Sequence, residues 1–434
     1  MCYAIPAKVV GTKENEAWVE YFGRRRKVRR DLIHIRPGDY VYVQAGMAIS
    51  RIGRKEAEKI LRLWQGLFHK LRRRDEILSR AGPGQGAPSD FRQAPGRGSL
   101  PKRLSQADSL YFLSPAGREK TAAFCRLANG LRSEYLGNCC CVHGVIEMSN
   151  FCAGNCLYCG IRKDNRSLRR YRMREEEIVG LVGQGVNKYG FRAFVLQSGE
   201  DGFYTRNRVL RIIRKIRRMF PVLIFLSLGE RPFGDYYDFY AAGARGALLR
   251  FETANPSLYS RLRPGRSLGQ RLRLIYELKK IGYILATGFL CGLPKEDDRD
   301  ILNNILLTKR ISADMVSFGP FIPHPRTPLA GQRAMPLDKV LRIIALMRII
   351  DRRSSILVTT ATETLARQAR GAGLRAGANS LMVNLTPLAR RRLYDIYPRF
   401  EADKQASDAD ALIRREIAAV VRLLRSLGRA PIAL

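Results

Sequence analysis

Three cysteines in one short segment have the clearest chemical potential in this sequence. Cys152, Cys156 and Cys159 stand in the stretch CAGNCLYC, with three and then two residues between them. Thiolates at this spacing fall within one compact loop, and each can bind a different iron of a 4Fe-4S cubane. A zinc site is the alternative, but the segment offers no nearby fourth ligand of the kind that structural zinc sites use. The motif therefore predicts an iron-sulfur cluster held by three cysteines.

Three ligands leave the fourth iron of such a cluster open. An open iron can chelate the amino and carboxylate groups of S-adenosylmethionine (SAM), and an electron from the cluster then releases a 5′-deoxyadenosyl radical. The protein's task in that chemistry is to position the reactants and to exclude water. The motif thus predicts a radical SAM enzyme whose cofactors are a 4Fe-4S cluster and SAM.

The residues around the motif predict the fold that positions it. From Val142 onward, eight apolar segments alternate with charged segments of helical spacing: GVIEMS, AFVLQSG, VLIFLSLG, GALLRFET, ILATGFLCG, DMVSFGPF, ILVTTAT and SLMVNLT. Eight such units specify an α/β protein with a (β/α)8 TIM-type barrel. The cysteine motif follows the first strand directly, so it belongs at the carboxyl ends of the strands, where such barrels build their active sites.

Polar residues at the ends of the other predicted strands support this placement. They are Ser149, Gln197, Ser198, Glu200, Ser227, Glu230, Arg250, Glu252, Thr359, Thr360 and Asn384. Charged residues in otherwise apolar strands need partners. Arg250 and Glu252 can therefore be ligands of a cofactor, or they can form an ion pair with each other near the top of the barrel.

The stretch from about residue 117 to 400 resembles the HydE family of FeFe-hydrogenase maturases, which belongs to the radical SAM group with biotin synthase and methylornithine synthase. The resemblance rests on IEMSNFCAGNCLYCGIRKDN, FVLQSGED, LSLGER, LLRFETANPSLYSRLRPGRS, TGFLCGLP, GPFIPHPRTPL, VTTATETLA and NSLMVNLTP followed by LYDIYP. Several of these segments lie far from the cysteine motif. A generic radical SAM enzyme is not expected to share them all.

Carried over position by position, the resemblance implies roles for many residues. Tyr158 would pack beside the adenine, Gln197, Ser198 and Glu200 would lie near the methionine portion, and Arg250, Glu252 and Arg271 would hold the carboxylate, ribose or sulfonium regions of SAM. The cofactor site would also include Ser227, Glu230, Gly288, Gly292, Met382 and Tyr394. Thr359, Thr360 and Tyr397, with Arg250 and Glu252, would face the reaction, and Met315 would line the same cavity.

The implied substrate is a small organometallic species, a cysteine-bound iron carbonyl cyanide, converted during assembly of the hydrogenase diiron centre. Two positions depart from the family pattern. Phe251 stands where a His is expected, and Phe225 stands where a Thr is usual. Each change is expected to remove an anion-binding donor from the cavity. An amino-acid mutase or methylase, similar to methylornithine synthase or biotin synthase, is the alternative enzyme, and a non-catalytic assembly scaffold is the alternative of another class.

The first 65 residues resemble the hydrogenase assembly chaperone family HypC, through MCYAIPAKVV, PGDYVYVQAGMAISRI and the helical EAEKIL. In that family Cys2 binds an iron cyanide carbonyl unit or a partner, and a terminal thiolate suits the transfer of a soft iron fragment. Gln44 replaces the usual His. The fusion suggests that Cys2 delivers substrate to the barrel mouth, or takes product from it. Expected partners are other hydrogenase maturation proteins or a hydrogenase precursor.

The remainder of the sequence sets the organisation of the chain. We expect a small β-barrel with a helix over residues 1–75, with AKVVGT, AWVEYF, RKVRRDL and DYVYVQAGMAI as strands and the helix beginning near Lys55. A mobile linker rich in Gly, Pro and Arg is expected over 76–110, and the large barrel over 111–434. Nine cysteines, an odd number, with no export signal and no long apolar run, predict a cytoplasmic protein that spans no membrane.

The net charge of +38 makes nucleic acid a candidate partner. The basic residues are spread along the whole chain, and no nucleic-acid-binding motif with interleaved aromatic residues is present in the sequence. The charge therefore favours a generally basic surface over a dedicated nucleic-acid site.

Overall fold

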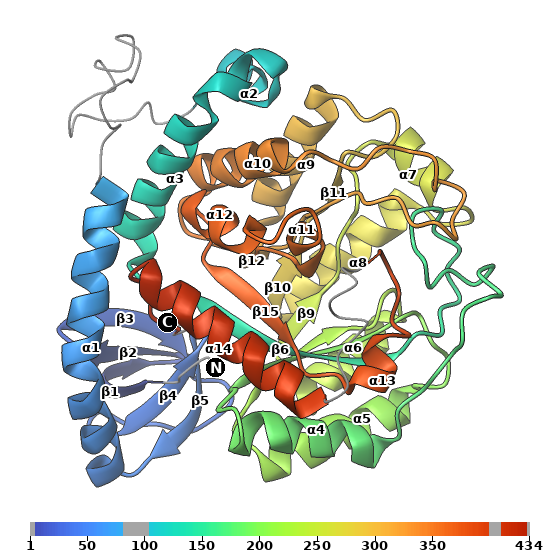
Figure 1. Ribbon diagram of the computed structural model, residues 1–434. Coiled ribbons are helices and arrows are strands. Elements are labelled where there is room, and N and C mark those ends of the chain that lie inside the picture. The colour runs from blue at the N-terminus through green and yellow to red at the C-terminus, as the bar shows by residue number, and fades with distance from the viewer. Residues whose placement is uncertain (1–4, 81–103, 399–408, 432–434) are drawn as a thin grey trace.

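The computed structural model of the chain describes residues 5–80, 104–398 and 409–431, and it contains a small closed barrel and a larger, nearly closed barrel of eight parallel strands (Figure 1). Cys2 and most of the predicted linker lie outside these ranges. The (β/α)8 barrel and the small N-terminal β-barrel predicted from the sequence are both confirmed. Within the described ranges, no helix combines the length and the apolar character needed to cross a membrane.

The small barrel closes in the order β1-β2-β3-β5-β4. Its strands are β1 (Pro6–Lys13), β2 (Glu16–Tyr21), β3 (Arg24–Arg29), β4 (Tyr40–Gln44) and β5 (Met47–Ile52). The segment DYVYVQAGMAI, predicted as one strand, is wrong as a single element, because Ala45 and Gly46 both have positive φ, 49° and 73°, and turn the chain back on itself. Such a two-residue turn produces an antiparallel hairpin, here between β4 and β5.

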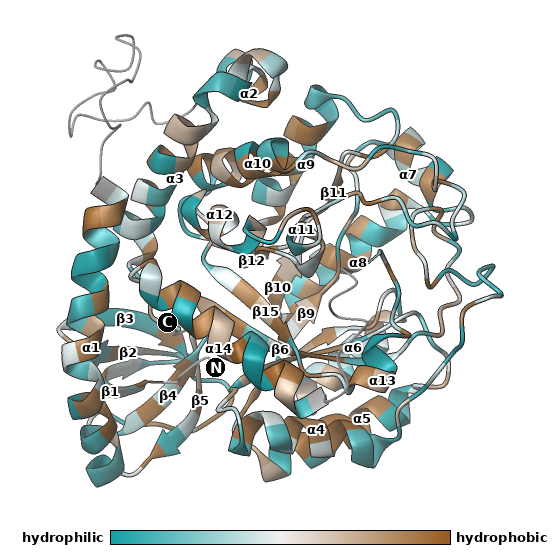
Figure 2. Ribbon diagram, in the orientation of Figure 1, coloured by the Kyte–Doolittle hydropathy of each residue, from teal (hydrophilic) through white to brown (hydrophobic). Residues whose placement is uncertain are grey.

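Helix α1 (Arg54–Arg80) follows the small barrel, close to the predicted start. Its Phe68 and Leu71 are buried in the apolar core of that barrel. Figure 2 shows hydrophilic and hydrophobic stretches alternating along α1, as expected of a helix with one apolar face. The far end of α1 packs against α3 (Thr121–Leu136) of the large domain.

The large barrel is a parallel sheet with the order β14-β12-β10-β9-β8-β7-β6-β15. All eight predicted strands are present: β6 (Cys141–Ser149), β7 (Ala193–Ser198), β8 (Leu223–Ser227), β9 (Gly246–Leu248), β10 (Ile284–Thr287), β12 (Met315–Val316), β14 (Ser355–Ile356) and β15 (Ser380–Asn384). The two ends of the sheet meet because the Val358 amide donates to the Ser380 carbonyl at 3.0 Å and the Asn379 amide donates to the Ile356 carbonyl at 3.0 Å. A pair of short strands, β11 (Leu290–Cys291) and β13 (Gly319–Pro320), lies beside it.

Helices surround the parallel strands (Figure 1). They are α2 (Gln106–Leu113), α3, α4 (Glu175–Asn187), α5 (Arg206–Met219), α6 (Phe233–Ala241), α7 (Pro256–Leu262), α8 (Leu268–Ile281), α9 (Asp298–Ile311), α10 (Leu337–Ile350), α11 (Thr360–Glu363), α12 (Ala369–Arg375), α13 (Leu388–Arg391) and α14 (Ala409–Ser426), with a 3-10 turn at Pro115–Lys120. Outward-facing strand residues such as Val142 and Ile146 form one large apolar core with these helices. Inward-facing residues such as Val145 belong to a separate core inside the barrel.

The small barrel closes the amino-terminal end of the large one. Met47 and Ile49 of β5 share one buried apolar cluster with Val145, Val195 and Phe225, which line the inside of the large barrel. Polar contacts surround this plug: Arg29 donates to the carbonyl of Gly282 at 2.6 Å, and Asp31 pairs with Arg245 at 2.9 Å. Gly282 and Arg245 both precede strands of the large barrel. The small barrel therefore sits at the end opposite to the strand ends that bear the cysteine motif.

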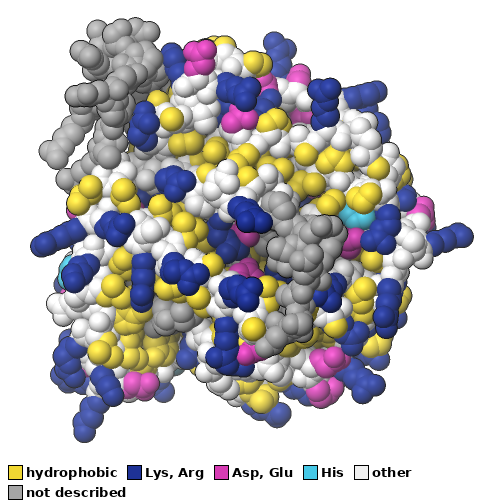
Figure 3. All heavy atoms as spheres, in the orientation of Figure 1, with side chains coloured by type: hydrophobic (Ala, Val, Ile, Leu, Met, Phe, Trp, Pro, Cys, Tyr) yellow, Lys and Arg dark blue, Asp and Glu magenta, His cyan; other side chains and the backbone are white. Residues whose placement is uncertain are grey.

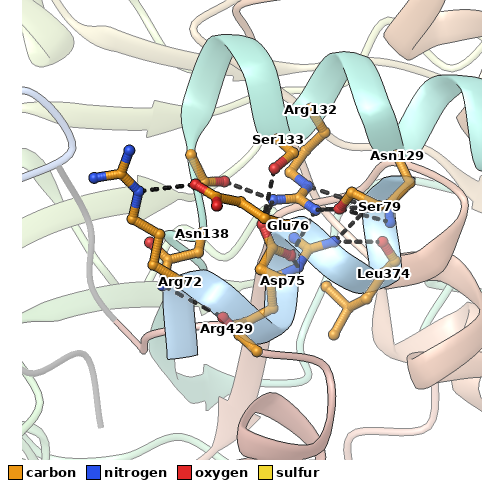
Figure 4. A network of polar contacts seen from close by, with 12 residues as sticks. Arg72, Asp75, Glu76, Ser79, Asn129, Arg132, Ser133, Asn138, Leu374 and Arg429 are labelled. Carbon is orange, nitrogen blue, oxygen red and sulfur yellow. Dashed lines mark hydrogen bonds and ion pairs between the residues drawn. The ribbon is translucent and has the colours of Figure 1, made fainter. Parts of the chain in front are cut away.

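A second contact between the domains is ionic and fully buried (Figure 4). Asp75 of α1 accepts two hydrogen bonds of 2.8 Å from Arg132 of α3, and Arg429 lies 3.0 Å from the same carboxylate. The three side chains are at most 2% exposed. Burial, and next the charge of the nearby Arg132, lower the pKa of Arg429 to about 9 against the opposing effect of Asp75. Asp75 is thus the counter-charge that allows two arginines to be buried together.

Candidate active site

The three cysteines lie in the loop that follows β6 and line one cavity of about 270 Å³. The loop folds tightly because Gly154 has no side chain: a Cβ there would lie 3.3 Å from the Cys152 sulfur and 3.9 Å from the Cys156 sulfur. The backbone amides of Gly154 and Glu200 point at the Cys152 sulfur from 3.3 and 3.4 Å. Donors in this position stabilise negative charge on a metal-bound sulfur.

The donor set fits a 4Fe-4S cluster better than a single metal ion. In the part of the chain that the structure describes, no group of three His, Cys, Asp or Glu residues is arranged to hold one metal ion. The ligands of a cubane bind different irons, so their sulfurs need not converge on one point. Burial raises the pKa of Cys152 and of Cys159, so binding of a cluster must displace their protons.

Most of the predicted site residues stand on the wall of the same cavity. They are Tyr158, Gln197, Ser198, Glu200, Ser227, Arg250, Glu252, Arg271, Thr359, Thr360, Met382, Tyr394 and Tyr397. These residues come from the ends of six strands and from the loops and helices that follow them, and only closure of the barrel brings them together. Their individual roles stay predictions.

A network of two glutamates and three arginines forms one side of the cavity. Glu200 and Glu230 face Arg271, which lies 3.0 Å from Glu230 and 3.8 Å from Glu200. Arg266 pairs with both glutamates, and Arg263 lies 3.8 to 3.9 Å from each. Glu230 itself does not line the cavity, and these contacts hold it behind the residues that do.

Arg263 and Arg266 are not among the site residues predicted from the sequence. The available signal was the stretch RLRPGRS, where a cluster of arginines and a turn follow two strand ends that carry unpaired glutamates.

Arg250 and Glu252 form the ion pair that the sequence left as one alternative, with 3.4 Å between Nη2 and Oε2. The pair does not satisfy the glutamate. Its buried Oε2 has no hydrogen-bond partner among the described residues, and the backbone of Glu252 has a left-handed φ of 69°. Strained backbone of this kind concentrates at ligand sites. The carboxylate is therefore poised to accept a hydrogen bond from a ligand in the cavity.

Hydroxyl and amide groups also line the cavity. The Gln197 side chain donates to the Tyr394 hydroxyl at 3.1 Å, Thr360 is hydrogen-bonded to Tyr397, and Thr359 lies 3.1 Å from Thr362. This side of the cavity is neutral and can exchange hydrogen bonds with a polar ligand.

Three residues that were predicted to belong to the site, Gly288, Gly292 and Met315, do not line the cavity. Gly288 is needed because a Cβ there would lie 2.2 Å from the Ser317 carbonyl oxygen, and Gly292 because its φ is 85° and a Cβ would meet Met335 at 2.8 Å. Both glycines allow close packing of protein on protein, and neither lines the cavity. Met315 packs in the apolar cluster with Met47, below the cavity.

The two departures from the family pattern also lie away from the cavity wall. Phe225 belongs to the buried cluster that receives the plug, and its ring packs against His143. Phe251 lies near Phe289 in the core outside the barrel, and the two ring centroids are 6.1 Å apart. The expectation that these residues remove donors from the cavity is therefore wrong. Phe225 instead builds the apolar seat for the small barrel.

Comparison with known proteins agrees with this architecture. Residues 1–64 match the HupF/HypC family, residues 146–307 the radical SAM superfamily, and residues 317–428 the biotin and thiamin synthesis associated domain. The FeFe hydrogenase maturase subunit HydE of Thermotoga maritima is 41% identical over 323 residues, which are 74% of this chain and 89% of that protein. The chain belongs to the HydE family of FeFe-hydrogenase maturases. It is a radical SAM enzyme, and that family implies a 4Fe-4S cluster and SAM as cofactors.

More distant relatives share the fold. The 3-methylornithine synthase of Methanosarcina barkeri is 27% identical over 334 residues, which are 76% of this chain and 91% of that protein. The crystal structure of methylornithine synthase superposes with a TM-score of 0.65 at 23% identity, covering 82% of this chain and 97% of that one. HydG from Carboxydothermus hydrogenoformans superposes with a TM-score of 0.61 at 17% identity, covering 85% and 81%. The members of the HydE family thus share their barrel with enzymes of other substrates.

Proposed function

We propose that this HydE-family enzyme acts on a cysteine-bound iron carbonyl cyanide precursor during assembly of the FeFe-hydrogenase diiron centre. The observation that carries the proposal is the 41% identity to HydE of Thermotoga maritima over nearly all of that protein. The cavity supports it, because its mixed charged and hydroxyl walls suit a polar ligand.

When bound, the cluster supplies the electron that cleaves SAM to a 5′-deoxyadenosyl radical. The residues of this chain position the reactants. Cys152, Cys156 and Cys159 hold the cluster, and the charged wall around Arg271, Glu200 and Glu252 binds the zwitterionic and ribose portions of SAM through charge-assisted hydrogen bonds. Closed packing below the cavity keeps water from the reacting atoms on that side.

The proposal is tested with the anaerobically reconstituted holoenzyme and dithionite. A synthetic cysteine complex of iron carbonyl cyanide should raise formation of 5′-deoxyadenosine and yield an adenosylated paramagnetic product. Lysine, the probe for an amino-acid mutase, should do neither. Stimulation by lysine and not by the iron complex would favour the mutase, and a protein that forms no 5′-deoxyadenosine at all would favour the assembly scaffold.

The HypC-like domain extends the proposal to protein partners. The small barrel, in which the described residues begin at Ile5, plugs the end of the large barrel that lies opposite the cysteine motif. We infer that Cys2 exchanges an iron fragment with another molecule, either a maturation protein or a hydrogenase precursor. Delivery within one chain is the alternative to this exchange.

Complementation in cells tests this exchange. A chain with Cys2→Ala and a chain with Cys152→Ala should each fail to support hydrogenase maturation, and the two expressed together should restore it. Failure to restore maturation would indicate that Cys2 and the cluster must belong to the same chain. Normal maturation by the Cys2→Ala chain alone would exclude a role for Cys2.

A further inference from the structure

A second cavity, of about 640 Å³, lies beside the seam where β14 and β15 close the large barrel. The seam is short because β14 contains only Ser355 and Ile356, and after Val358 the chain turns into α11. In the described part of the chain, Met382 and Asn384 of β15 therefore pair with β6 on one side and with no strand on the other. Both residues line the cavity, whose outer wall is formed by α12 and α14.

This lateral cavity adjoins the cavity that bears the cysteines. Five residues line both: Gln197, Thr360, Met382, Ile396 and Tyr397. The other end of the lateral cavity is bordered by the exposed residues Arg367, Gln368, Arg375 and Arg415. It thus reaches from the protein surface to the wall of the cysteine cavity through the side of the barrel.

Ion pairs hold the middle of the lateral cavity together. Arg370 of α12 forms two hydrogen bonds of 2.6 Å with Glu363, and it lies 3.3 Å from Glu416 of α14. Arg391 of α13 pairs with the same Glu416 at 3.1 Å. Burial raises the pKa of Glu363 to about 7, against the opposing effect of Arg370. Two glutamates are thus matched by two arginines, and the four helices are fixed around the opening.

The outer rim carries further positive charge. Arg367, Arg375 and Arg415 have no carboxylate of a described residue within ion-pair distance. Figure 3 shows basic side chains gathered with acidic ones over α12 and α14 on this face of the molecule. A rim of arginines at the mouth of a low-dielectric cavity attracts anions and raises their local concentration. The basic run 390–392, which the active site does not use, contributes Arg391 to this wall.

The inner end offers amide and hydroxyl groups beside one carboxylate. Glu147, Gln197, Asn384, Thr360 and Tyr397 stand there. The volume also matters: the cysteine cavity, at about 270 Å³, lies just below the usual range of roughly 300 to 1,000 Å³ for one small-molecule site. SAM and a second substrate therefore need more space than the cysteine cavity provides.

We propose that the lateral cavity is the entry route and holding site for the second substrate, a small anion rich in hydrogen-bond acceptors, while SAM occupies the cysteine cavity. This inference rests on the proposed function for the identity of that anion as an iron carbonyl cyanide complex. The arginine rim recruits the anion, and the amide and hydroxyl groups at the inner end orient it toward the radical.

Kinetics of the reconstituted holoenzyme with the iron complex test the route. The double variant Arg367→Gln/Arg415→Gln should raise KM for the complex about tenfold, with a smaller change in kcat, and should weaken the dependence of kcat/KM on salt. Arg425→Gln, which removes an exposed arginine of α14 outside the cavity, is the matched control and should behave as the wild type. An unchanged KM in the double variant would overturn the role of the rim.

Obstruction of the cavity provides a second test. Ala419→Trp places an indole at the outer end of the cavity, whereas Ala411→Trp places one on the exposed part of the same helix outside it. Turnover of the iron complex should fall at least tenfold in the first variant and stay at the wild-type level in the second. If the wild type turns over the iron complex and the Ala419→Trp variant turns over the iron complex equally well, the lateral route is wrong while the proposed function stands.

A readout without turnover keeps the inference testable if the iron complex is not the substrate. The measured quantity is the ratio of fluorescence quenching by the anion iodide to quenching by uncharged acrylamide. This ratio should be higher for the indole introduced by Ala419→Trp than for the indole introduced by Ala411→Trp. When Arg367→Gln and Arg415→Gln are added to the Ala419→Trp variant, this difference in the ratio should disappear. Equal ratios of iodide to acrylamide quenching in the two variants would overturn anion recruitment, whatever the enzyme's substrate.

Discussion

At the carboxyl ends of its strands the large barrel carries charged, amide and hydroxyl side chains around a cavity, whereas at the amino ends it is filled with apolar side chains and closed by the small barrel. The change occurs within single strands. Inward-facing neighbours two residues apart are apolar below and polar above: Val145 and Glu147, Val195 and Gln197, Phe225 and Ser227, Leu248 and Arg250, Met315 and Ser317, Leu357 and Thr359, and Met382 and Asn384.

This contrast separates two tasks in one barrel. The upper layer can bind ligands because its polar groups are free to turn toward a cavity. The lower layer can bind a second domain because it presents an apolar surface that Met47 and Ile49 fill. Changes at the upper end should therefore alter chemistry without loss of folding, and changes at the lower end should alter stability without loss of chemistry.

The largest effect is expected at the upper end. Replacement of Cys152 by Ser should abolish the 4Fe-4S absorption of the reconstituted protein and all cleavage of SAM, because a cluster with two thiolates is no longer held. Ultraviolet-visible and electron paramagnetic resonance spectra, with an assay of 5′-deoxyadenosine, measure this. Cys125→Ser, at a partly buried cysteine outside the cavity, should keep both properties. Full iron content and activity in the Cys152 variant would contradict the cluster assignment.

The next largest effect is expected at the buried ionic contact between the domains. Asp75→Ala leaves Arg132 and Arg429 buried without their counter-charge and should lower the free energy of unfolding by about 3 to 5 kcal/mol. Denaturant titration measures this loss. Glu76→Ala removes the neighbouring carboxylate of α1, which pairs with Arg72 near the surface, and should cost at most about 1 kcal/mol. Equal costs for the two variants would mean that the buried network does not hold the domains together.

A smaller loss is expected from the plug itself. Met47→Ala removes a fully buried side chain from the apolar cluster and should destabilise the protein by about 3 kcal/mol through lost contacts and a residual cavity. Cleavage of SAM at a temperature where the variant stays folded should not change. Met219→Ala, at a methionine that is 57% exposed, is the control and should be neutral. A large loss of SAM cleavage in folded Met47→Ala would show that the two ends are coupled.

The smallest effect is a pH dependence at the lower end. Burial lowers the pKa of His143 from 6.5 to about 4, so the native state binds fewer protons than the unfolded state between these values. Stability should therefore fall with falling pH, by about 1 kcal/mol between pH ~7.5 and pH ~5.5. Comparison with His143→Leu by denaturant titration isolates this contribution. The same pH profile in both proteins would mean that His143 does not carry it.

Much of the upper end could be predicted from the sequence because its signals are local. The spacing of the three cysteines, the alternation of eight apolar and helical segments, and the polar residues at strand ends each depend on neighbours in the chain. In a parallel barrel these local signals suffice, since the carboxyl ends of all strands lie on the same side. The turn at Ala45 and Gly46 was missed because an apolar run on both sides of it has the pattern of one strand.

The sequence by itself determined the barrel, the cluster loop and most of the cavity wall. Only the tertiary structure decided what the rest of the chain does: that Asp75 meets Arg132 and Arg429, that Phe225 seats a second domain, and that Arg370, Glu363 and Glu416 frame an opening at the seam of β14 and β15. The physical reason is that these contacts join segments far apart in the chain. Their partners are chosen by closure of the barrel and docking of the small domain, and no local periodicity encodes either.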